Sequence, residues 1–192
     1  MEPIETEVKL RCESVDQFMK RLKEAGAALK LKRDRHFEDN FILDSESRTV
    51  GGRLGALRVR KTDHVATVTL KELPPANAVE SKFKSRIELE TSVGDGDVML
   101  QIFARLGFLK CFRYQKYRTV YEAFLPSGES LDVMFDETPI GVFAELEGVE
   151  SNVARVLEVI GAGRDEHILL SYLALQIEEC ARRGQPFSDM VF

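Results

Sequence analysis

The feature that most restricts the fold of this chain is a repeated alternation of charged and apolar residues. In IETEVKL, residues 4–10, Glu5, Glu7 and Lys9 occupy alternate positions between Ile4, Val8 and Leu10. Successive side chains of a β-strand point to opposite faces, so this segment predicts a strand with one charged face and one apolar face. Such a strand lies either at a surface or with its charged face toward a polar cavity.

The same alternation recurs in five further segments whose charged faces carry almost only Arg, Lys and Glu. The residues are Arg58 and Arg60 (ALRVRK), Lys71 (TVTLK), Arg86, Glu88 and Glu90 (RIELE), Lys116 and Arg118 (QKYRTV), and Glu145 and Glu147 (FAELEG). One such strand is typical of an antiparallel sheet with its polar face in water. Six together favour a sheet that closes into a barrel, with charged faces inward and apolar faces outward beneath helices. For the acids and for Arg58 and Arg60, a plain lattice of ion pairs is the alternative to a ligand-binding role.

Turn and capping residues divide the chain into further elements. A helix is predicted from Ser14, with Gln17 three residues on, to Gly26. LPPANAV, residues 73–79, predicts a loop because two prolines do not fit inside a central strand. The predicted strands are 4–11, 37–43, 56–61, 65–71, 84–91, 116–125, 129–135 and 142–149, and the other predicted helices are 95–106, 151–160 and 166–183. We therefore expect an α+β fold, an eight-stranded antiparallel tunnel with a charged lumen and helices outside. It would form a single domain over residues 1–192, with a C-terminal helix and tail at about 166–192.

Composition excludes several classes of protein. Hydrophobic residues make up 44% and charged residues 31% of the 192, which is typical of a soluble globular chain. The net charge of −5 gives no reason to expect a nucleic-acid partner, and no apolar run approaches membrane-spanning length. The three cysteines fit neither a disulfide framework nor a zinc site. We expect a cytoplasmic protein, monomeric or homodimeric, whose partner is a small molecule.

The charged faces also indicate what such a lumen would bind. Carboxylates clustered on neighbouring strands suit a hard divalent cation, Mg²⁺ or Mn²⁺. Clustered arginines and lysines suit phosphate oxygens. Both together suit a polyphosphate chelated by a metal ion.

These residues carry a resemblance to a known family. ETEVK resembles the ExExK signature of the CYTH superfamily, the triphosphate tunnel metalloenzymes. The segments LRVR, TLK, RIELE, RLGF, KYRTVY, LDVMFD, GVFAELEG and SYLAL follow in the family's order, so the resemblance covers about residues 4–175. It implies an eight-stranded antiparallel tunnel and an activity like that of class IV adenylyl cyclases, thiamine triphosphatases or inorganic triphosphatases.

The resemblance also implies roles for individual residues. Divalent-metal binding falls to Glu5, Glu7, Glu145 and Glu147, with Glu88, Glu90 and Asp132 as helpers. Triphosphate binding falls to Lys9, Arg58, Arg60, Lys71, Arg86, Lys116 and Arg118.

One segment departs from the family pattern. EDNFILDS, residues 38–45, resembles a stretch that often carries tyrosine before the aspartate, but Phe41, Ile42 and Leu43 precede Asp44 here. No phenol is available from this stretch to pair with a lysine and activate water. The resemblance then implies either that Lys9 or Lys71, with a metal-bound water, takes the catalytic role, or that hydrolysis is not the native reaction.

The expected function is that of a divalent-metal-dependent triphosphatase acting on inorganic triphosphate or on an organic one, such as thiamine or nucleoside triphosphate. The first alternative is a class IV adenylyl cyclase that converts ATP to cyclic AMP and pyrophosphate. The second is a non-catalytic sensor of polyphosphate or nucleotide. The loops at 44–55 and 72–83 are expected at the tunnel mouth, where the rest of the substrate would bind.

Overall fold

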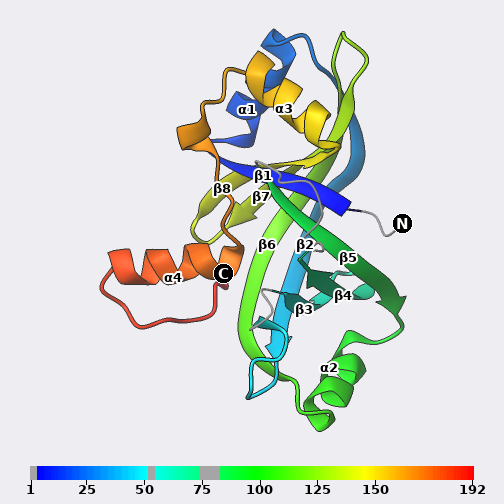
Figure 1. Cartoon of the computed structure of the whole chain (residues 1–192), viewed down its shortest axis with the longest axis vertical. Coiled ribbons are helices and arrows are strands. Elements are labelled where there is room, and N and C mark those ends of the chain that lie inside the picture. Colours follow the sequence, from blue (N-terminus) through cyan, green and yellow to red (C-terminus); the bar gives the residue numbers. More distant parts are fainter. Residues whose placement is uncertain (1–3, 52–54, 74–82) are drawn as a thin grey trace.

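The alternating segments form one closed sheet in a computed structural model that describes residues 4–51, 55–73 and 83–192, with only the backbone of residues 4 and 5. The strands are β1 (Ile4–Cys12), β2 (Ala28–Asp44), β3 (Ala56–Lys61), β4 (Ala66–Glu72), β5 (Lys84–Val93), β6 (Leu109–Phe124), β7 (Ser130–Thr138) and β8 (Gly141–Gly148). They follow one another around the ring in the order β1-β5-β4-β3-β2-β6-β7-β8, and β8 pairs with β1. Every pair is antiparallel, which confirms the predicted α+β tunnel (Figure 1).

The four α-helices of the described residues lie outside this ring (Figure 1). They are α1 (Val15–Glu24), α2 (Gly96–Arg105), α3 (Glu150–Val159) and α4 (Tyr172–Arg182). The first begins as predicted, because the Ser14 hydroxyl accepts a hydrogen bond from the Gln17 backbone N–H at 3.2 Å. The chain leaves α1 through Gly26, whose φ of +83° suits a residue without a Cβ atom.

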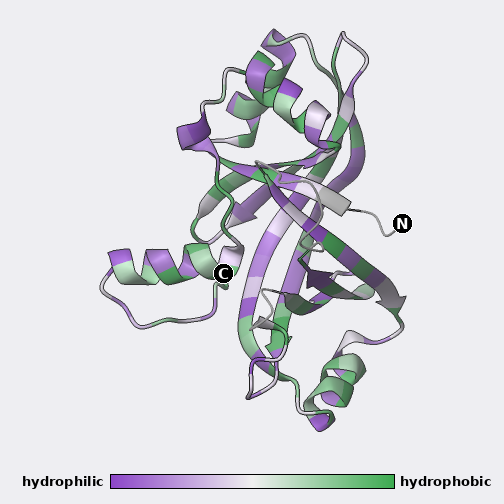
Figure 2. Ribbon diagram, in the orientation of Figure 1, coloured by the Kyte–Doolittle hydropathy of each residue, from purple (hydrophilic) through white to green (hydrophobic). Residues whose placement is uncertain are grey.

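The largest apolar core lies between the outer face of the sheet and the helices α1 and α3. Val8, Leu10 and Leu146 of β1 and β8 pack there with Leu22 and Val156, and each is at most 1% exposed. Burying a side chain of this size stabilises the fold by about 1.5–3 kcal/mol. This burial directs the alternate, charged residues of the same strands inward, and the alternation is visible along the ribbons of Figure 2.

Two smaller apolar clusters attach the other helices. Leu57 and Val59 of β3 pack against Phe103 of α2. Tyr172 and Leu175 of α4 pack with Phe112 and Tyr114 of β6 in the second cluster. The C-terminal helix is thereby held against the ring of strands.

Two strands are longer than the sequence indicates. β2 begins at Ala28 instead of 37, and β6 begins at Leu109 instead of 116. The first half of β2 is largely exposed, and its register with β6 shifts on either side of Arg33. Residues 29–32 (LKLK) alternate, but the charged run at 33–36 interrupts the pattern and the segment has no buried face, so the strand was not predicted there.

The last helix was predicted to begin at 166 but begins at Tyr172. The Ser171 hydroxyl caps it by accepting from the Ala174 N–H at 3.2 Å. Before it, Ile168 is extended and exchanges two backbone hydrogen bonds with Lys9, at 3.1 and 2.9 Å. Pairing with β1 therefore replaces the first helical turn.

Other boundaries agree within about three residues. The predicted loop at 73–79 lies almost wholly outside the described residues, as does most of the mouth loop predicted at 72–83. No helix in the described ranges is long and apolar enough to cross a membrane.

Candidate active site

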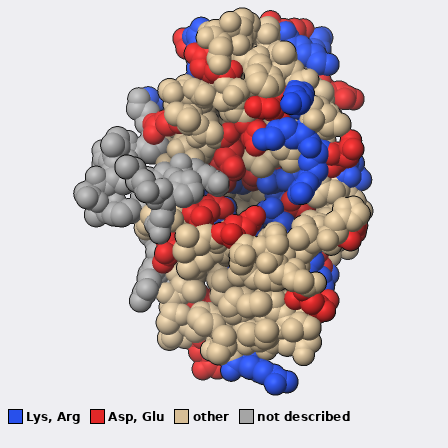
Figure 3. Space-filling view, turned by 90° about the vertical axis from the view of Figure 1, so that its right-hand side faces the viewer, with Lys and Arg blue, Asp and Glu red and all other residues tan. Residues whose placement is uncertain are grey.

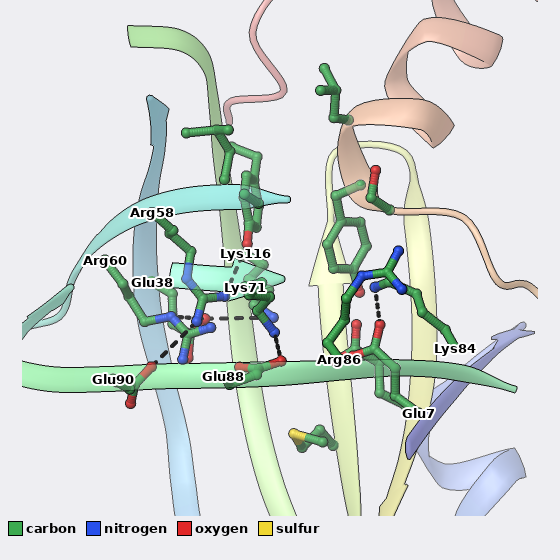
Figure 4. Close-up of a pocket in the computed structure, with 18 of the residues that line it drawn as sticks. Glu7, Glu38, Arg58, Arg60, Lys71, Lys84, Arg86, Glu88, Glu90 and Lys116 are labelled. Carbon is green, nitrogen blue, oxygen red and sulfur yellow. Dashed lines mark hydrogen bonds and ion pairs between the residues drawn. The ribbon is translucent and has the colours of Figure 1, made fainter. Parts of the chain in front are cut away.

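The ring of strands encloses a cavity of about 670 Å³, and nearly all the charged residues singled out from the sequence line it. The basic residues on its wall include Lys9, Arg58, Arg60, Lys71, Arg86, Lys116 and Arg118, and the acids include Glu7, Glu88, Glu90, Asp132, Glu145 and Glu147. The Glu5 side chain falls outside the described part of the structure. Figure 3 shows acidic and basic side chains gathered around a hollow in the surface, and Figure 4 shows labelled members of the set projecting into the pocket.

The strand register brings charged residues of neighbouring strands together. Glu7 lies opposite Glu147, and Lys9 opposite Glu145, in the β1–β8 ladder. Residues directly opposite on one face of an antiparallel pair are near neighbours. The charged faces of the six alternating segments thereby form one continuous lining of the cavity.

Lys9 lies between two carboxylates on the β1–β8 side. Its Nζ is 3.1 Å from Glu7 Oε1 and 3.1 Å from Glu145 Oε1. Burial disfavours the charged form of Lys9, yet the charges of Glu145 and Glu7 outweigh burial and raise its pKa above the ordinary value. Lys9 is therefore held as a cation in the unliganded tunnel.

The same charges act on the two carboxylates. Burial and the negative charge of Glu145 raise the pKa of Glu7, but Lys9 and Lys84 outweigh them and bring it to about 2. Burial also opposes ionisation of Glu145, and there Lys9 and Arg118 hold the pKa well below its usual range. Both carboxylates are therefore ionised at neutral pH, and each is near enough to perturb the other.

A second buried group centres on Asp136, whose side chain is fully inaccessible to solvent. Its Oδ2 accepts hydrogen bonds from Lys116 Nζ at 2.8 Å, Arg118 Nη2 at 2.6 Å and the Tyr172 hydroxyl at 2.6 Å. Arg118 also donates from Nε to Asp136 Oδ1 at 2.6 Å and contacts Glu145. These four residues, the Asp136 cluster, fix two of the proposed phosphate-binding cations and join α4 to the tunnel wall.

On the opposite wall Arg58 connects three strands. Its Nη2 donates to Thr69 Oγ1 at 3.0 Å and lies 3.5 Å from Glu90 Oε2, and its Nη1 donates to the Tyr114 hydroxyl at 3.5 Å. Its Nε is buried without a hydrogen-bond partner.

The neighbouring cations of this wall are paired as well. Arg60 Nε donates to Asn40 Oδ1 at 3.0 Å and lies 3.2 Å from Glu38 Oε2, while Lys71 contacts Glu88 (Figure 4). The basic side chains on this side are held in place by acids and amides of adjacent strands.

Several residues of this site were not identified from the sequence, among them Glu38, Lys84, Tyr114, Asp136 and Tyr172. Lys84 alternates with Arg86 and Tyr114 with Lys116, so each lies one step along a strand face already identified. Asp136 lies two steps from Asp132, through Met134. Glu38 lies on β2, where no site residue was expected. Tyr172 carries no such signal, because it reaches the site through the packing of α4.

Two phenols reach the site from other elements of the fold. Phe41, Ile42 and Leu43 supply none, but Tyr114 and Tyr172 reach the cavity from β6 and α4. Burial raises the pKa of Tyr114, yet Arg58 and Lys116 outweigh it and lower that pKa below its ordinary value. For Tyr172, burial and the charge of Asp136 raise the pKa well above the usual range. The two phenols therefore differ in acidity although both are buried.

The acids provide the right chemistry for a divalent ion but are engaged with cations here. No group of three Asp, Glu, His or Cys among the described residues is arranged to hold a metal as it stands. Glu7 and Glu145 contact Lys9, and Asp132 accepts from Lys32 Nζ at 2.7 Å. Glu7 and Glu145 nevertheless lie close enough to repel each other, and Glu147 lines the same cavity. Such a set of hard oxygen donors fits Mg²⁺ or Mn²⁺.

Comparison with known proteins gives consistent results. Residues 3–170 match the CYTH domain family. A protein of Methanocaldococcus jannaschii named "putative adenylate cyclase" is 26% identical over 184 residues, which cover 90% of this chain and 98% of that protein.

Two solved structures share the fold. One, from Vibrio parahaemolyticus and described as a "putative adenylate cyclase", aligns with a TM-score of 0.71 at 15% identity and covers 90% of this chain and 97% of its own. The other, a "putative adenylyl cyclase" from Hippeastrum described as revealing a dominant triphosphatase activity, aligns with a TM-score of 0.60 at 18% identity over 97% of both chains. Since the family match spans most of the sequence and the closed ring of eight antiparallel strands accompanies it, the chain belongs to the CYTH family.

Proposed function

We propose that the protein is a divalent-metal-dependent enzyme that hydrolyses a triphosphate bound in the tunnel. The observation that carries the proposal is the coexistence of buried cations and buried carboxylates on the wall of one open cavity. Burying a charged side chain away from water costs free energy unless an opposite charge lies beside it. A triphosphate with its metal ion supplies both signs at once.

Each class of side chain has a role in this reaction. Arg58, Arg60, Lys116 and Arg118 would bind phosphate oxygens, with Arg86 and Lys71 extending the cationic wall. These cations are already held by their neighbours, so they would reorganise little as negative charge grows on the phosphates during the reaction. Such preorganisation is the main source of catalysis in phosphoryl transfer. Lys9, held protonated, would act as a cation beside the reacting phosphate.

The carboxylates Glu5, Glu7, Glu145 and Glu147 would hold Mg²⁺ or Mn²⁺, with Glu88, Glu90 and Asp132 as helpers. When bound, the metal would neutralise phosphate charge and polarise the phosphorus–oxygen bonds. Lys9 and Lys71 are the candidates for a catalytic role, and the phenol of Tyr114 lies in the same cavity.

The printed names of the relatives bear on the choice of reaction. The Hippeastrum protein's dominant triphosphatase activity supports hydrolysis. The adenylate cyclase name of the Methanocaldococcus jannaschii relative supports the second candidate, cyclisation of ATP to cyclic AMP and pyrophosphate.

One experiment separates the candidates. The protein would be incubated with inorganic triphosphate, thiamine triphosphate or ATP, with Mg²⁺ or Mn²⁺, and phosphate, cyclic AMP and pyrophosphate would be measured together. Phosphate release supports hydrolysis, and cyclic AMP with equal pyrophosphate supports cyclisation. Tight binding without either product would contradict the enzyme and favour a sensor.

A further inference from the structure

One end of the tunnel cavity has an apolar wall. Where β2 ends and β3 and β6 begin, the cavity is lined by Ile42, Val50, Ala56, Cys111 and Leu173. The Cys111 side chain is exposed, and the other four are only half-buried. Apolar surface therefore faces the cavity at this end, and we call these five residues the apolar wall.

The backbone holds the apolar wall in place. Cys111 Sγ donates to the carbonyl of Ile42 at 3.4 Å, and the Gly55 N–H donates to the carbonyl of Val50 at 3.1 Å. The Asp44 carboxylate accepts from the backbone N–H groups of Ser45, Val50 and Gly51 at 2.8, 3.1 and 2.9 Å. Asp44 thus fixes the turn that carries Val50, and its charge is occupied by backbone donors.

The apolar wall adjoins the proposed phosphate-binding cations. Ile42 lies opposite Arg58 in the β2–β3 ladder. Along one face of β6, Arg118, Lys116 and Tyr114 line the cavity in turn, and the Tyr114 ring stacks on the buried Phe112 with centroids 5.7 Å apart. Positions two apart on a strand are separated by about 6.5 Å, so the aromatic ring lies one such step from the nearest cation of this strand.

The cavity is also larger than a bare triphosphate requires. An oxygen the size of a water takes about 30 Å³, so the ten oxygens of inorganic triphosphate account for about 300 Å³. The cavity holds about 670 Å³. Space is therefore left beside a bound triphosphate, and part of the cavity is bounded by apolar side chains.

We propose that the apolar wall binds the uncharged organic group of the substrate, so that the preferred substrate class is an organic triphosphate and not inorganic triphosphate. This rests on the proposed function, which places the phosphates on the cations. Inorganic triphosphate carries more negative charge than a triphosphate monoester, so the cations alone would favour the inorganic ion. Tighter binding of an organic triphosphate must then come from contacts beyond the phosphates.

Two variants isolate the apolar wall. Leu173→Asn replaces an apolar side chain by a polar one of similar size, and Cys111→Phe fills space at the exposed position. Leu170→Asn is the matched control, because Leu170 is 38% exposed on the same segment and is not among the residues that line the cavity. Leu173 also packs against the apolar cluster that holds α4, so Leu173→Asn could unfold the protein. Cys111→Phe keeps the test valid in that case.

The measurement is calorimetric titration of the full chain, with Mg²⁺, by ATP, CTP, thiamine triphosphate and inorganic triphosphate. At least one organic triphosphate should bind tenfold or more tightly than the inorganic ion. Leu173→Asn and Cys111→Phe should weaken that binding at least fivefold and change inorganic triphosphate less than twofold, while Leu170→Asn changes neither.

The two proposals fail in different ways. If inorganic triphosphate binds and is hydrolysed as well as every organic one, or if the variants affect both ligands equally, the assignment of the apolar wall is overturned and the proposed function stands. If no triphosphate binds, both are overturned.

Discussion

Replacing Asp136 by Asn should destabilise the protein strongly, because Asp136 is the common acceptor of two buried cations. The substitution keeps the shape but removes the charge that Lys116 and Arg118 share. Breaking a buried ion pair by removing one partner costs about 3–5 kcal/mol. Total stabilities are about 5–15 kcal/mol, so the loss should be plain in urea unfolding. The remaining partners, Glu38 for Lys116 and Glu145 for Arg118, keep the loss within that range.

Two further substitutions calibrate this result. Asp132→Asn makes the same change on the same face of β7, but the Asp132 side chain is 33% exposed and its partner Lys32 is 42% exposed. An ion pair of this kind contributes at most about 1 kcal/mol. Tyr172→Phe removes one hydrogen bond to the Asp136 carboxylate, which contributes about 1.5–3 kcal/mol. The expected order of destabilisation is therefore Asp136→Asn, then Tyr172→Phe, then Asp132→Asn.

Ligand binding provides an independent readout. In Asp136→Asn, Lys116 and Arg118 lose their shared acid and should attract an anion more strongly, so inorganic triphosphate should raise the unfolding free energy of the variant by more than that of the wild type. Binding at a hundred times the dissociation constant adds about 2.7 kcal/mol. The reasoning is refuted if Asp136→Asn unfolds as easily as Asp132→Asn, or if triphosphate stabilises variant and wild type equally.

Four other outcomes are expected. Glu147→Gln should abolish metal-dependent turnover while Glu24→Gln, a change at an exposed glutamate, leaves it intact; wild-type activity at limiting metal would remove Glu147 from the site. Arg58→Ala should raise the triphosphate dissociation constant roughly tenfold or more, because a charge-assisted hydrogen bond contributes about 1.5–3 kcal/mol. Calorimetry should show a smaller loss of affinity for phosphate, and Arg155→Ala on the surface is the control. The pKa of Glu7 is lowered from 4.5 to about 2, so the stability that its ionised form gives to the fold is complete above pH 4.5 and is lost as the pH falls toward 2. Glu7→Gln should flatten that part of the pH–stability curve, and an unchanged curve would count against the pairing of Glu7 with Lys9 and Lys84. Mg²⁺ and triphosphate together should raise the melting temperature by more than the sum of their separate effects, whereas strictly additive shifts would show that the two bind independently.

Local pattern was enough to predict the fold and most of the charged lining. A period of two determines which residues share a face, so Lys9 and Glu7 could be placed on one face without knowledge of their neighbours. Closure into a ring followed because the opposite faces, with residues such as Val8 and Leu146, needed helices to cover them. These inferences depend only on residues close together in the sequence.

The partners of the lining residues could not be predicted in the same way. Lys9 lies between Glu7 and Glu145 only because β1 pairs with β8 in one register, and that register is a long-range property. Tyr172 reaches Asp136 across 36 positions of sequence through the packing of α4. The sequence therefore indicates which charges face inward, while tertiary contacts decide which of them neutralise one another.

The internal pairing has a consequence for how ligands enter. Lys9 and Arg118 now neutralise Glu145, and the same two cations are among those proposed to bind phosphate. A triphosphate that draws Lys9 and Arg118 toward its oxygens leaves Glu145 with uncompensated negative charge in a poorly solvated place. A divalent cation then relieves a cost that the anion has created, and the converse holds when the metal arrives first. Because Lys9 and Arg118 pair with Glu145 in the unliganded tunnel, we expect anion and metal binding to be coupled through these two cations.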